Sequence, residues 1–247
     1  MLTAQRKQII QSELDRAGRV IARDLAQRFD LSEDTIRRDL RQMASAGLCQ
    51  RVYGGAVAPS AGKLAVRHDH LSAEKTRLAQ TAVTLLQPGQ TVMIDAGSTN
   101  TAIARALPTD MNLTIATNAP DIAHLLTGRS DLRLIMLGGN YHPGLGACLG
   151  RETRAAITNL QAHWLFLGTC GLDADAGVTA FDAGEAEVKA TMAAFSDQVA
   201  IAVTGEKLGT AAHFPVLPTE KVHSLIAEDR SALTPYRKKG LSVVTPG

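Results

Sequence analysis

The segment 32–42 contains the first side chains whose types and spacing indicate a chemistry. If the segment is helical, one exposed arc carries a threonine, two arginines and a glutamine, which are Thr35, Arg38, Arg41 and Gln42, because successive helical residues are about 100° apart. An arginine can pair with a guanine edge or clamp a phosphate, and a threonine can reach a base edge or a thymine methyl group. The segment therefore predicts contact with the major groove of duplex DNA.

A simpler interpretation of the same segment is a solvated helix with ion pairs along its surface. Glu33 and Arg37 are four residues apart, and so are Asp34 and Arg38, which is the spacing of such pairs. Ser32 favours the DNA interpretation, because it is a typical N-cap and because donors at a helix N-terminus can meet a phosphate. The candidate DNA-binding residues are Ser32, Thr35, Arg37, Arg38, Arg41, Gln42, Arg51, Tyr53, Gly54 and Gly55.

Three helices and a hairpin would present this segment. The spacing of apolar residues predicts helices over 5–17, 20–29 and about 33–46, followed by short strands over 48–53 and 56–57 around a glycine turn. Such an arrangement is typical of a winged helix-turn-helix, whose wing can lie along neighbouring phosphates. We therefore expect a DNA-binding domain over residues 1–57.

A second chemistry is indicated by residues 95–101, which read DAGSTNT and lie between an apolar run and a helical stretch. Gly97 permits a close approach of the backbone, Ser98 and Thr99 have hydroxyl donors, and a helix N-terminus favours an anion. The loop predicts a phosphate cradle, although many turns of small residues between a strand and a helix hold no ligand. Polar or glycine-rich turns also follow other predicted strands, at 117–118, 138–141 and 168–171.

Apolar runs and helical stretches alternate through residues 75–247. Strands are predicted over 91–95, 113–117, 132–137, 164–168, 199–204, 222–227 and 241–244, and helices over 75–86, 99–107, 120–127, 152–160, 185–195 and 231–238. This alternation indicates a Rossmann-like, mostly parallel sheet covered on both faces, with ligands at the carboxyl ends of its strands. The stretch 58–74, which is polar and contains Pro and Gly, is interpreted as a linker. The fold class is multidomain α/β.

Three stretches of the N-terminal region follow a specific motif. Residues 31–40 read LSEDTIRRDL, residues 46–48 read AGL, and residues 51–56 read RVYGGA. These residues resemble the signature of the DeoR family of bacterial sugar-catabolism repressors, which is close to VSxxTIRRDL with GxxxRxxGGA after it. The resemblance implies a winged helix-turn-helix that binds a double-stranded operator.

The remainder of the chain resembles the DeoR-family sensor domain more weakly, through the pattern DxG(S/T)T, TN, GG, GxxGxD and ExxxK. The resemblance implies a fold similar to ribose-5-phosphate isomerase and glucosamine-6-phosphate deaminase. It also implies that Lys189 or Lys207 neutralises a phosphate, while the 95–101 loop holds it through backbone N–H groups. The candidate effector-binding residues are Asp95, Gly97, Ser98, Thr99, Asn100, Thr101, Asn118, Gly138, Gly139, Glu185, Lys189 and Lys207.

One turn departs from the family pattern. Where family members have DxSKFG, residues 204–209 read TGEKLG, so that Thr204 replaces an aspartate and Glu206 replaces a serine. A carboxylate beside Lys207 could cancel part of the attraction of that lysine for phosphate. Either the ligand is less anionic than usual, or Glu206 points away from it.

Composition restricts the remaining classes. Residues 1–70 contain 12 Lys/Arg against 8 Asp/Glu, so the excess of positive charge lies in the region that carries the arginine helix. No apolar stretch approaches the roughly 20 residues that span a bilayer, and the N-terminus shows no signal peptide. Cys49, Cys148 and Cys170 are far apart, and the histidines have no metal-ligand spacing. We expect a cytoplasmic protein without a metal, a cofactor or a membrane partner.

These observations lead to two functional hypotheses. The first is a transcription repressor of a carbohydrate-utilisation operon, which binds its operator as a homo-oligomer, a dimer or a tetramer, and responds to a phosphorylated sugar or polyol. The second is a sugar-phosphate isomerase or deaminase, which needs a catalytic base aimed at a substrate carbon. Asp95, Glu185 and Glu187 are candidate bases, but their spacing commits none of them. The first hypothesis is preferred, and the chain is not expected to be an enzyme.

Overall fold

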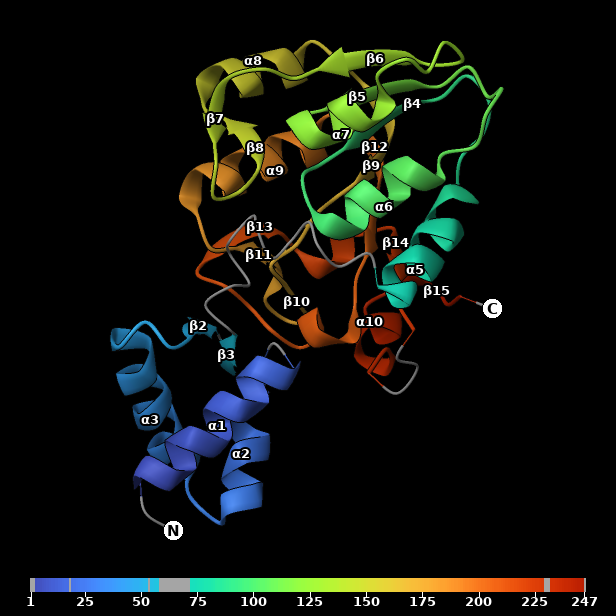
Figure 1. The fold of residues 1–247 in the computed structure, drawn as a ribbon. Coiled ribbons are helices and arrows are strands. Elements are labelled where there is room, and N and C mark those ends of the chain that lie inside the picture. The colour runs from blue at the N-terminus through green and yellow to red at the C-terminus, as the bar shows by residue number, and fades with distance from the viewer. Residues whose placement is uncertain (1–2, 18, 53, 58–71, 229–231, 247) are drawn as a thin grey trace.

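The computed structural model describes residues 3–17, 19–52, 54–57, 72–228 and 232–246. Within these residues, buried hydrophobic side chains form two separate clusters, one between Ile10 and Ala56 and the other between Leu78 and Leu241. Figure 1 shows the corresponding parts of the molecule, a small helical part below and a larger α/β part above. None of the described helices is both long and apolar enough to cross a membrane.

The N-terminal part contains three helices and a three-stranded antiparallel sheet. Its elements are α1 (Thr3–Ala17), β1 (Arg19–Ile21), α2 (Ala22–Phe29), α3 (Glu33–Ser45), β2 (Gln50–Val52) and β3 (Gly55–Val57), with strand order β1-β3-β2. The prediction of a helix from residue 20 is wrong at its start, because Val20 lies in β1 and pairs with Ala56. The pairing partner is far along the chain, so the local pattern around Val20 does not reveal it.

The C-terminal part is built on a seven-stranded sheet whose neighbouring strands are all parallel, in the order β15-β14-β12-β9-β4-β5-β6. These strands are β4 (Thr91–Ile94), β5 (Thr114–Thr117), β6 (Arg133–Met136), β9 (Ala162–Phe166), β12 (Ser196–Ala202), β14 (Ser224–Ile226) and β15 (Ser242–Val244). The predicted parallel sheet is confirmed, with strand ends that differ from the expected ones by at most three residues.

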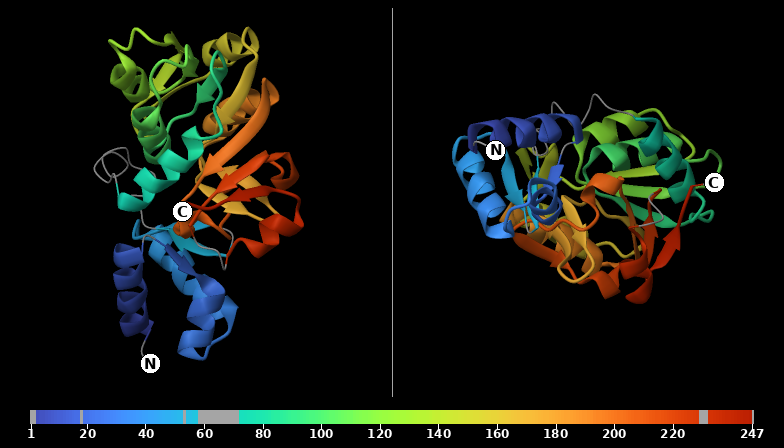
Figure 2. Two further views of the ribbon diagram at one scale, coloured as in Figure 1. Left: turned by 90° about the vertical axis from the view of Figure 1, so that its right-hand side faces the viewer. Right: turned by 90° about the horizontal axis from the view of Figure 1, so that it is seen from below.

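Helices cover both faces of this sheet, as Figure 2 shows. α5, α6 and α7 pack against one another on one face, and α8 packs against α9 on the other. The helices are α5 (Ala73–Val83), α6 (Ser98–Ala106), α7 (Pro120–Leu126), α8 (Arg151–Thr158), α9 (Ala183–Ala194) and α10 (Thr234–Lys238), with short 3-10 turns η2 (Gly205–Lys207) and η3 (Thr219–Lys221). α5 begins at Ala73, two residues before the predicted start.

Two smaller sheets were not expected from the sequence. β7 (Asn140–His142) and β8 (Ala147–Leu149) form a hairpin, and β10 (Gly171–Asp173), β11 (Gly177–Ala180) and β13 (Phe214–Leu217) form a second antiparallel sheet. In the second sheet β11 pairs with β13, which follows it only after α9 and β12. These strands have three or four residues each, too few for a clear alternating pattern.

The order of the large sheet creates a switch point between β4 and β9. From β4 the chain adds β5 and β6 on one side, and it then returns to add β9, β12, β14 and β15 on the other. The crossovers that follow β4 and β9 therefore leave in opposite directions, and at such a point α/β proteins are expected to bind ligands in a crevice at the carboxyl ends of the strands. Asp95 follows β4 and Gly168 lies shortly after β9, so the crevice lies between these two turns.

Candidate functional site

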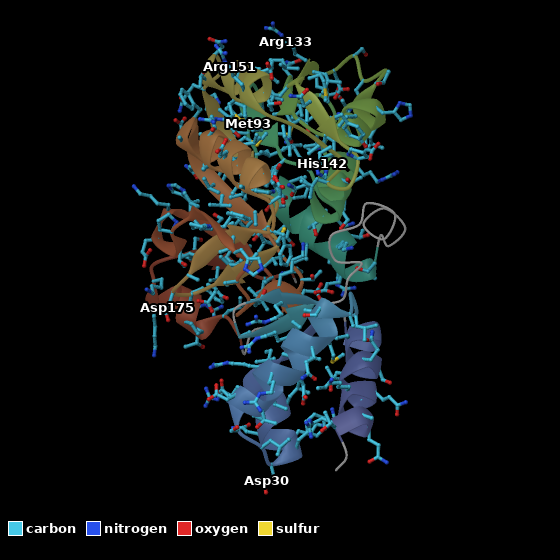
Figure 3. All side chains as sticks on the ribbon, turned by 90° about the vertical axis from the view of Figure 1, so that its left-hand side faces the viewer. Asp30, Met93, Arg133, His142, Arg151 and Asp175 are labelled. Atoms are coloured by element: carbon cyan, nitrogen blue, oxygen red, sulfur yellow. The ribbon has the colours of Figure 1, made fainter. Side chains whose placement is uncertain are left out.

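α3 presents basic side chains on an exposed face. Arg38 and Arg41 are both exposed, and neither forms an ion pair with another described residue. The opposite face of the helix is buried through Ile36, Leu40 and Met43. Figure 3 shows Asp30, which precedes α3, at the outer end of the N-terminal part, away from the C-terminal part. The N-terminal end of α3 therefore points out of the molecule, where a duplex can approach it.

The start of α3 is fixed by the expected cap. Ser32 Oγ accepts a hydrogen bond from Thr35 N at 3.3 Å and lies 2.9 Å from Thr35 Oγ1. Glu33 and Asp34 occupy the first turn, where the helix dipole favours negative charge. The predicted N-cap is confirmed, and the two hydroxyl groups sit together at the helix N-terminus.

Arg37 is held by carboxylates of its own helix. Its Nη2 lies 2.7 Å from Glu33 Oε2 and its Nη1 lies 3.6 Å from Asp34 Oδ1. The Glu33–Arg37 pair of the solvated-helix interpretation is thus present, whereas Asp34 contacts Arg37 and not Arg38. Exposed pairs of this kind contribute only about 0.5 kcal/mol, so Arg37 can exchange them for a phosphate.

In the hairpin after α3, the arginine is exposed to solvent, whereas the glycine turn lies close to other parts of the protein. Arg51 is exposed, as expected, and Tyr53 lies outside the described residues. Gly55 is buried, and a Cβ there would lie 2.0 Å from Val20 O. A Cβ at Gly54 would lie 4.0 Å from Gly209 O in the C-terminal part. In this arrangement the Gly54-Gly55 turn therefore faces the C-terminal part, which differs from the expected position along DNA phosphates.

The loop that opens α6 has free donors at the crevice. Gly97 is the N-cap with φ +146°, and no side chain among the described residues caps the first-turn N–H groups of α6. Ser98 is half-buried, Thr99 is buried, and Thr101 Oγ1 donates to Gly97 O at 3.1 Å. Asn100 has a structural role, because its Nδ2 donates to Asp95 O and to Phe166 O. The loop is thus tied to both strands of the switch point.

Lys189 forms a buried charge cluster with two carboxylates. Its Nζ contacts Asp95 Oδ2, and it lies 3.4 Å from Glu185 Oε1 and 3.0 Å from Gly168 O. Burial by itself lowers the pKa of Lys189, but the adjacent carboxylates outweigh burial and raise that pKa above its ordinary value. An ammonium has three donors, and these contacts occupy all of them. The expectation that Lys189 neutralises a ligand phosphate is therefore corrected: Lys189 neutralises Asp95 and Glu185.

Gly168 closes this cluster. Its N–H donates to Asp95 Oδ2 at 3.0 Å, and a Cβ at this position would lie 2.5 Å from Ala96 O and 2.8 Å from Asp95 Oδ2. Only glycine fits here, because any side chain would push the β4 and β9 turns apart. The packing of the switch point thus depends on Gly168. The sequence showed this residue only as part of a glycine-rich turn and did not reveal its packing role.

Asn118 lies after β5 with one side-chain atom unused. Its Nδ2 donates to Cys148 O at 3.2 Å, while its buried Oδ1 has no hydrogen-bond partner among the described residues.

Gly138 and Gly139 are exposed and contact α8: Thr153 Oγ1 donates to Gly138 O, and a Cβ at Gly139 would meet Thr153 Oγ1 at 2.1 Å. These contacts make the two glycines a turn that packs on α8.

Lys207 lies in η2 and reaches the turn after β9. Its Nζ donates to Thr169 O at 2.9 Å, and Lys207 is half-buried. Gly205 N of the same 3-10 turn contacts Glu74 Oε1 of α5 at 3.4 Å. Lys207 therefore lies beside the turn that follows β9, and it is the second of the two lysines expected to neutralise a phosphate.

Comparison with known proteins assigns both parts of the chain. Residues 6–61 match the DeoR-like helix-turn-helix domain, and residues 71–229 match the DeoR C terminal sensor domain. The chain belongs to the DeoR family. Its two matches cover the capped α3 helix and the crevice loops, so the DeoR-family resemblance of the sequence is confirmed in both parts. The protein is a DNA-binding transcriptional regulator with a sensor domain.

Named relatives of this DeoR-family chain are transcriptional regulators. The glycerol-3-phosphate regulon repressor of Escherichia coli K12 is 33% identical over 212 residues, which cover 85% of this chain and 84% of that protein. The HTH-type transcriptional regulator IolR of Bacillus subtilis is 26% identical over 216 residues, with 85% and 84% coverage. Among solved structures, ribose 5-phosphate isomerase A of Neisseria gonorrhoeae matches 56% of each chain at 14% identity and a TM-score of 0.41.

Sequence reasoning missed two residues that hold the DeoR-family recognition helix. Arg6 Nε lies 2.6 Å from Asp39 Oδ2, with side chains 7% and 5% exposed, and Lys7 Nζ donates to Gln42 Oε1 at 2.6 Å. A signal for the first pair was available. Arg6 precedes Ile10 by four residues and therefore falls on the buried face of α1, where a charged side chain requires a partner.

Proposed function

We propose that this DeoR-family regulator represses an operon for the use of a carbohydrate or polyol, and that a phosphorylated sugar or polyol changes its affinity for the operator. The observation that carries the proposal is the pair of exposed arginines, Arg38 and Arg41, which have no ion-pair partner among the described residues of a capped helix. Unpaired cations on a helix face cost little in water and become favourable beside phosphates or guanine edges.

DNA recognition would use the outward end of α3. Ser32 and Thr35 would meet a phosphate at the helix N-terminus, while Arg38 and Arg41 enter the major groove. One such module offers few base contacts, and two half-sites on a symmetric oligomer provide the usual specificity. We therefore propose a dimer or a tetramer of this chain. The predicted linker, residues 58–71 of which lie outside the described residues, must end before α5 begins at Ala73. A repressor must share a compartment with its operator, so we place its action in the bacterial cytoplasm.

The effector would bind in the crevice between β4 and β9. The uncapped N-terminus of α6, with the Ser98 hydroxyl beside it, supports phosphate binding through backbone N–H groups. Lys207 would supply a positive charge by exchanging its bond to Thr169 O for a phosphate oxygen. The unused Oδ1 of Asn118 is an acceptor that suits a sugar hydroxyl. The names of the relatives, a glycerol-3-phosphate regulon repressor among them, support the same class of effector.

The enzyme hypothesis is disfavoured by the contacts of two of its three candidate bases, while the third, Glu187, is exposed and pairs with Arg154 of α8. Asp95 and Glu185 both contact Lys189, and Asp95 also accepts the N–H of Gly168. A general base must lie within hydrogen-bond reach of the proton that it removes, and these carboxylates are buried and engaged with the protein. Binding without turnover is the outcome that the cluster supports.

Regulation requires that the effector bind one arrangement of the two domains better than another.

A fluorescence-anisotropy titration of the full chain with DNA from upstream of its own gene tests whether α3 binds the operator. Arg38→Ala and Arg41→Ala should each weaken binding about five- to 150-fold, since one specific arginine contact is worth about 1–3 kcal/mol. Arg237→Ala on α10 is the matched control, and it should leave affinity unchanged. Full affinity in both α3 variants would show that α3 is not the recognition helix.

A thermal-shift screen tests the effector half of the proposal. The full chain is heated with glycerol 3-phosphate, pentose phosphates, hexose phosphates and their unphosphorylated counterparts. A ligand that binds only the folded state raises the melting temperature, so a phosphorylated compound should do so and its unphosphorylated counterpart should not. Stabilisation by the unphosphorylated compounds alone contradicts a phosphate site. Product formation in the same mixtures would favour the isomerase or deaminase hypothesis.

A further inference from the structure

Two consecutive residues of α1 contact the recognition helix. Arg6 Nε lies 2.6 Å from Asp39 Oδ2, and Lys7 Nζ lies 2.6 Å from Gln42 Oε1. The first contact is buried, with side chains 7% and 5% exposed, and the second is at the surface. One residue of α1 thus anchors the helix pair from inside, and the next reaches the outer surface of α3.

The buried pair determines where Lys7 lies. A buried ion pair is costly to break, because the remaining charge would be left without a partner, so Arg6 and Asp39 hold the rotation of α1 against α3. Gln42 follows Asp39 by three residues, which turns it about 60° around the helix axis toward Arg38 and Arg41. Lys7 therefore extends from the boundary of the core to the edge of the basic face of α3.

The charge of Lys7 is not neutralised by its contact. Gln42 supplies a neutral amide oxygen, which takes one of the three donors of the ammonium. Within the described residues, Lys7 forms no ion pair with a carboxylate. A positive charge thus lies beside Arg38 and Arg41 at the edge of the surface that would enter the groove, where a DNA backbone passes.

We propose that Lys7 is an additional DNA-binding residue that contacts a backbone phosphate, oriented by Gln42 and positioned by the Arg6–Asp39 pair. This proposal rests on the proposed operator binding by α3. The ligand group is a phosphate diester of duplex DNA, so the contact adds affinity without reading sequence. In this proposal Gln42 orients Lys7 and does not itself contact a DNA base.

The test is the salt dependence of DNA binding by the full chain. Each phosphate neutralised by a cation contributes about 0.9 to the slope of log K against log salt concentration. Lys7→Gln should reduce the magnitude of this slope by about one and weaken binding to an operator fragment and to an unrelated duplex by the same factor. Lys7→Arg should restore the slope. Lys221→Gln, in η3 of the sensor domain, is the matched control and should leave the slope unchanged.

The variants separate a phosphate contact from a structural one. Gln42→Ala keeps the cation and should keep most of the slope. An unchanged slope in Lys7→Gln overturns the proposal, even if affinity falls, because a role limited to holding Gln42 releases no counterion. If Arg38→Ala weakens binding while Lys7→Gln leaves the slope unchanged, only this proposal fails. If neither Arg38→Ala nor Arg41→Ala weakens binding, the proposed function fails with it.

Discussion

The ammonium of Lys189 in α9 contacts the carboxylate of Asp95, which follows β4 and is 94 residues away in the sequence. The contact joins a helix on one face of the sheet to the loop that opens α6 on the other. With Glu185 and the backbone of Gly168, it holds the two turns of the switch point together. A buried charge cluster therefore fixes the two turns that flank the candidate effector site.

Replacing Lys189 by methionine should destabilise the sensor domain by about 3–5 kcal/mol, because two buried carboxylates would lose their cation. Guanidinium unfolding of the full chain measures this difference, and Lys221→Met on the exposed η3 turn should change stability by less than about 0.5 kcal/mol. A loss of similar size in both variants would indicate that the cluster adds no specific stability.

The pH dependence of the Lys189 contribution has a definite sign. Because its carboxylate neighbours raise the pKa of Lys189, the stability that it contributes is fully present below the unfolded pKa of about 10.4. That stability is lost only as the pH rises through the higher folded value. Burial raises the pKa of Asp95, and loss of Lys189 removes the charge that opposes this effect. The stability difference between the native chain and Lys189→Met should therefore not fall between about pH 6 and about pH 9, and a decline within that range contradicts the assignment.

Placing a carboxylate at the start of α6 should block the effector without unfolding the chain. Ser98→Asp adds negative charge at a helix N-terminus, where it stabilises by about 0.3–1 kcal/mol, but it repels an incoming phosphate. The thermal shift produced by a phosphorylated compound should disappear in Ser98→Asp and persist in Ser98→Ala. An undiminished shift in Ser98→Asp would move the phosphate site away from α6.

Gly55→Ala should disrupt the N-terminal domain. The new Cβ would lie 2.0 Å from Val20 O, in the β1–β3 pairing, so we expect a loss above about 3 kcal/mol together with loss of DNA binding. Gly47→Ala is the matched control, since φ there is +72° and the space is open; its expected cost is only the left-handed strain, about 1–2 kcal/mol. Thermal unfolding followed by circular dichroism measures the loss of stability, and DNA titration measures the loss of binding. A well-folded Gly55→Ala chain with full DNA affinity would refute the close packing of Gly55 against Val20.

The Asp131 carboxyl should titrate unusually low. Arg129 Nε donates to Oδ1 at 2.6 Å and Arg129 Nη2 to Oδ2 at 2.5 Å, and these bonds lower the pKa of Asp131 to about 2. The stability from this pair should be present above the unfolded pKa of about 3.9 and should be lost as the pH falls toward the folded value. Carboxyl NMR titration measures this pKa, and Arg129→Gln should return it to its ordinary range. An ordinary pKa in the native chain contradicts the bidentate pair.

The capped helix α3 could be predicted from the sequence because its determinants are local. Ser32, the acidic first turn and the stripe of Ile36, Leu40 and Met43 all act within one helix, and periodicity reveals them. The alternation of strands and helices predicted the parallel sheet for the same reason. The glycine turn at Gly54 was also visible, but its position against Gly209 depends on how the two parts meet.

The sequence by itself determined the arginine face of α3, its serine cap, the α/β class of the larger part and the position of the 95–101 loop between a strand and a helix. Only the tertiary structure decided that Val20 belongs to a strand, that Arg6 reaches Asp39 and that Lys189 neutralises Asp95 instead of a ligand. These contacts join residues 33 to 94 positions apart, and local periodicity has no information about which distant partner fills a buried site. Burial then determines which charged side chains pair with each other, because a charge removed from water needs a partner, and the fold decides which residue lies close enough to supply it.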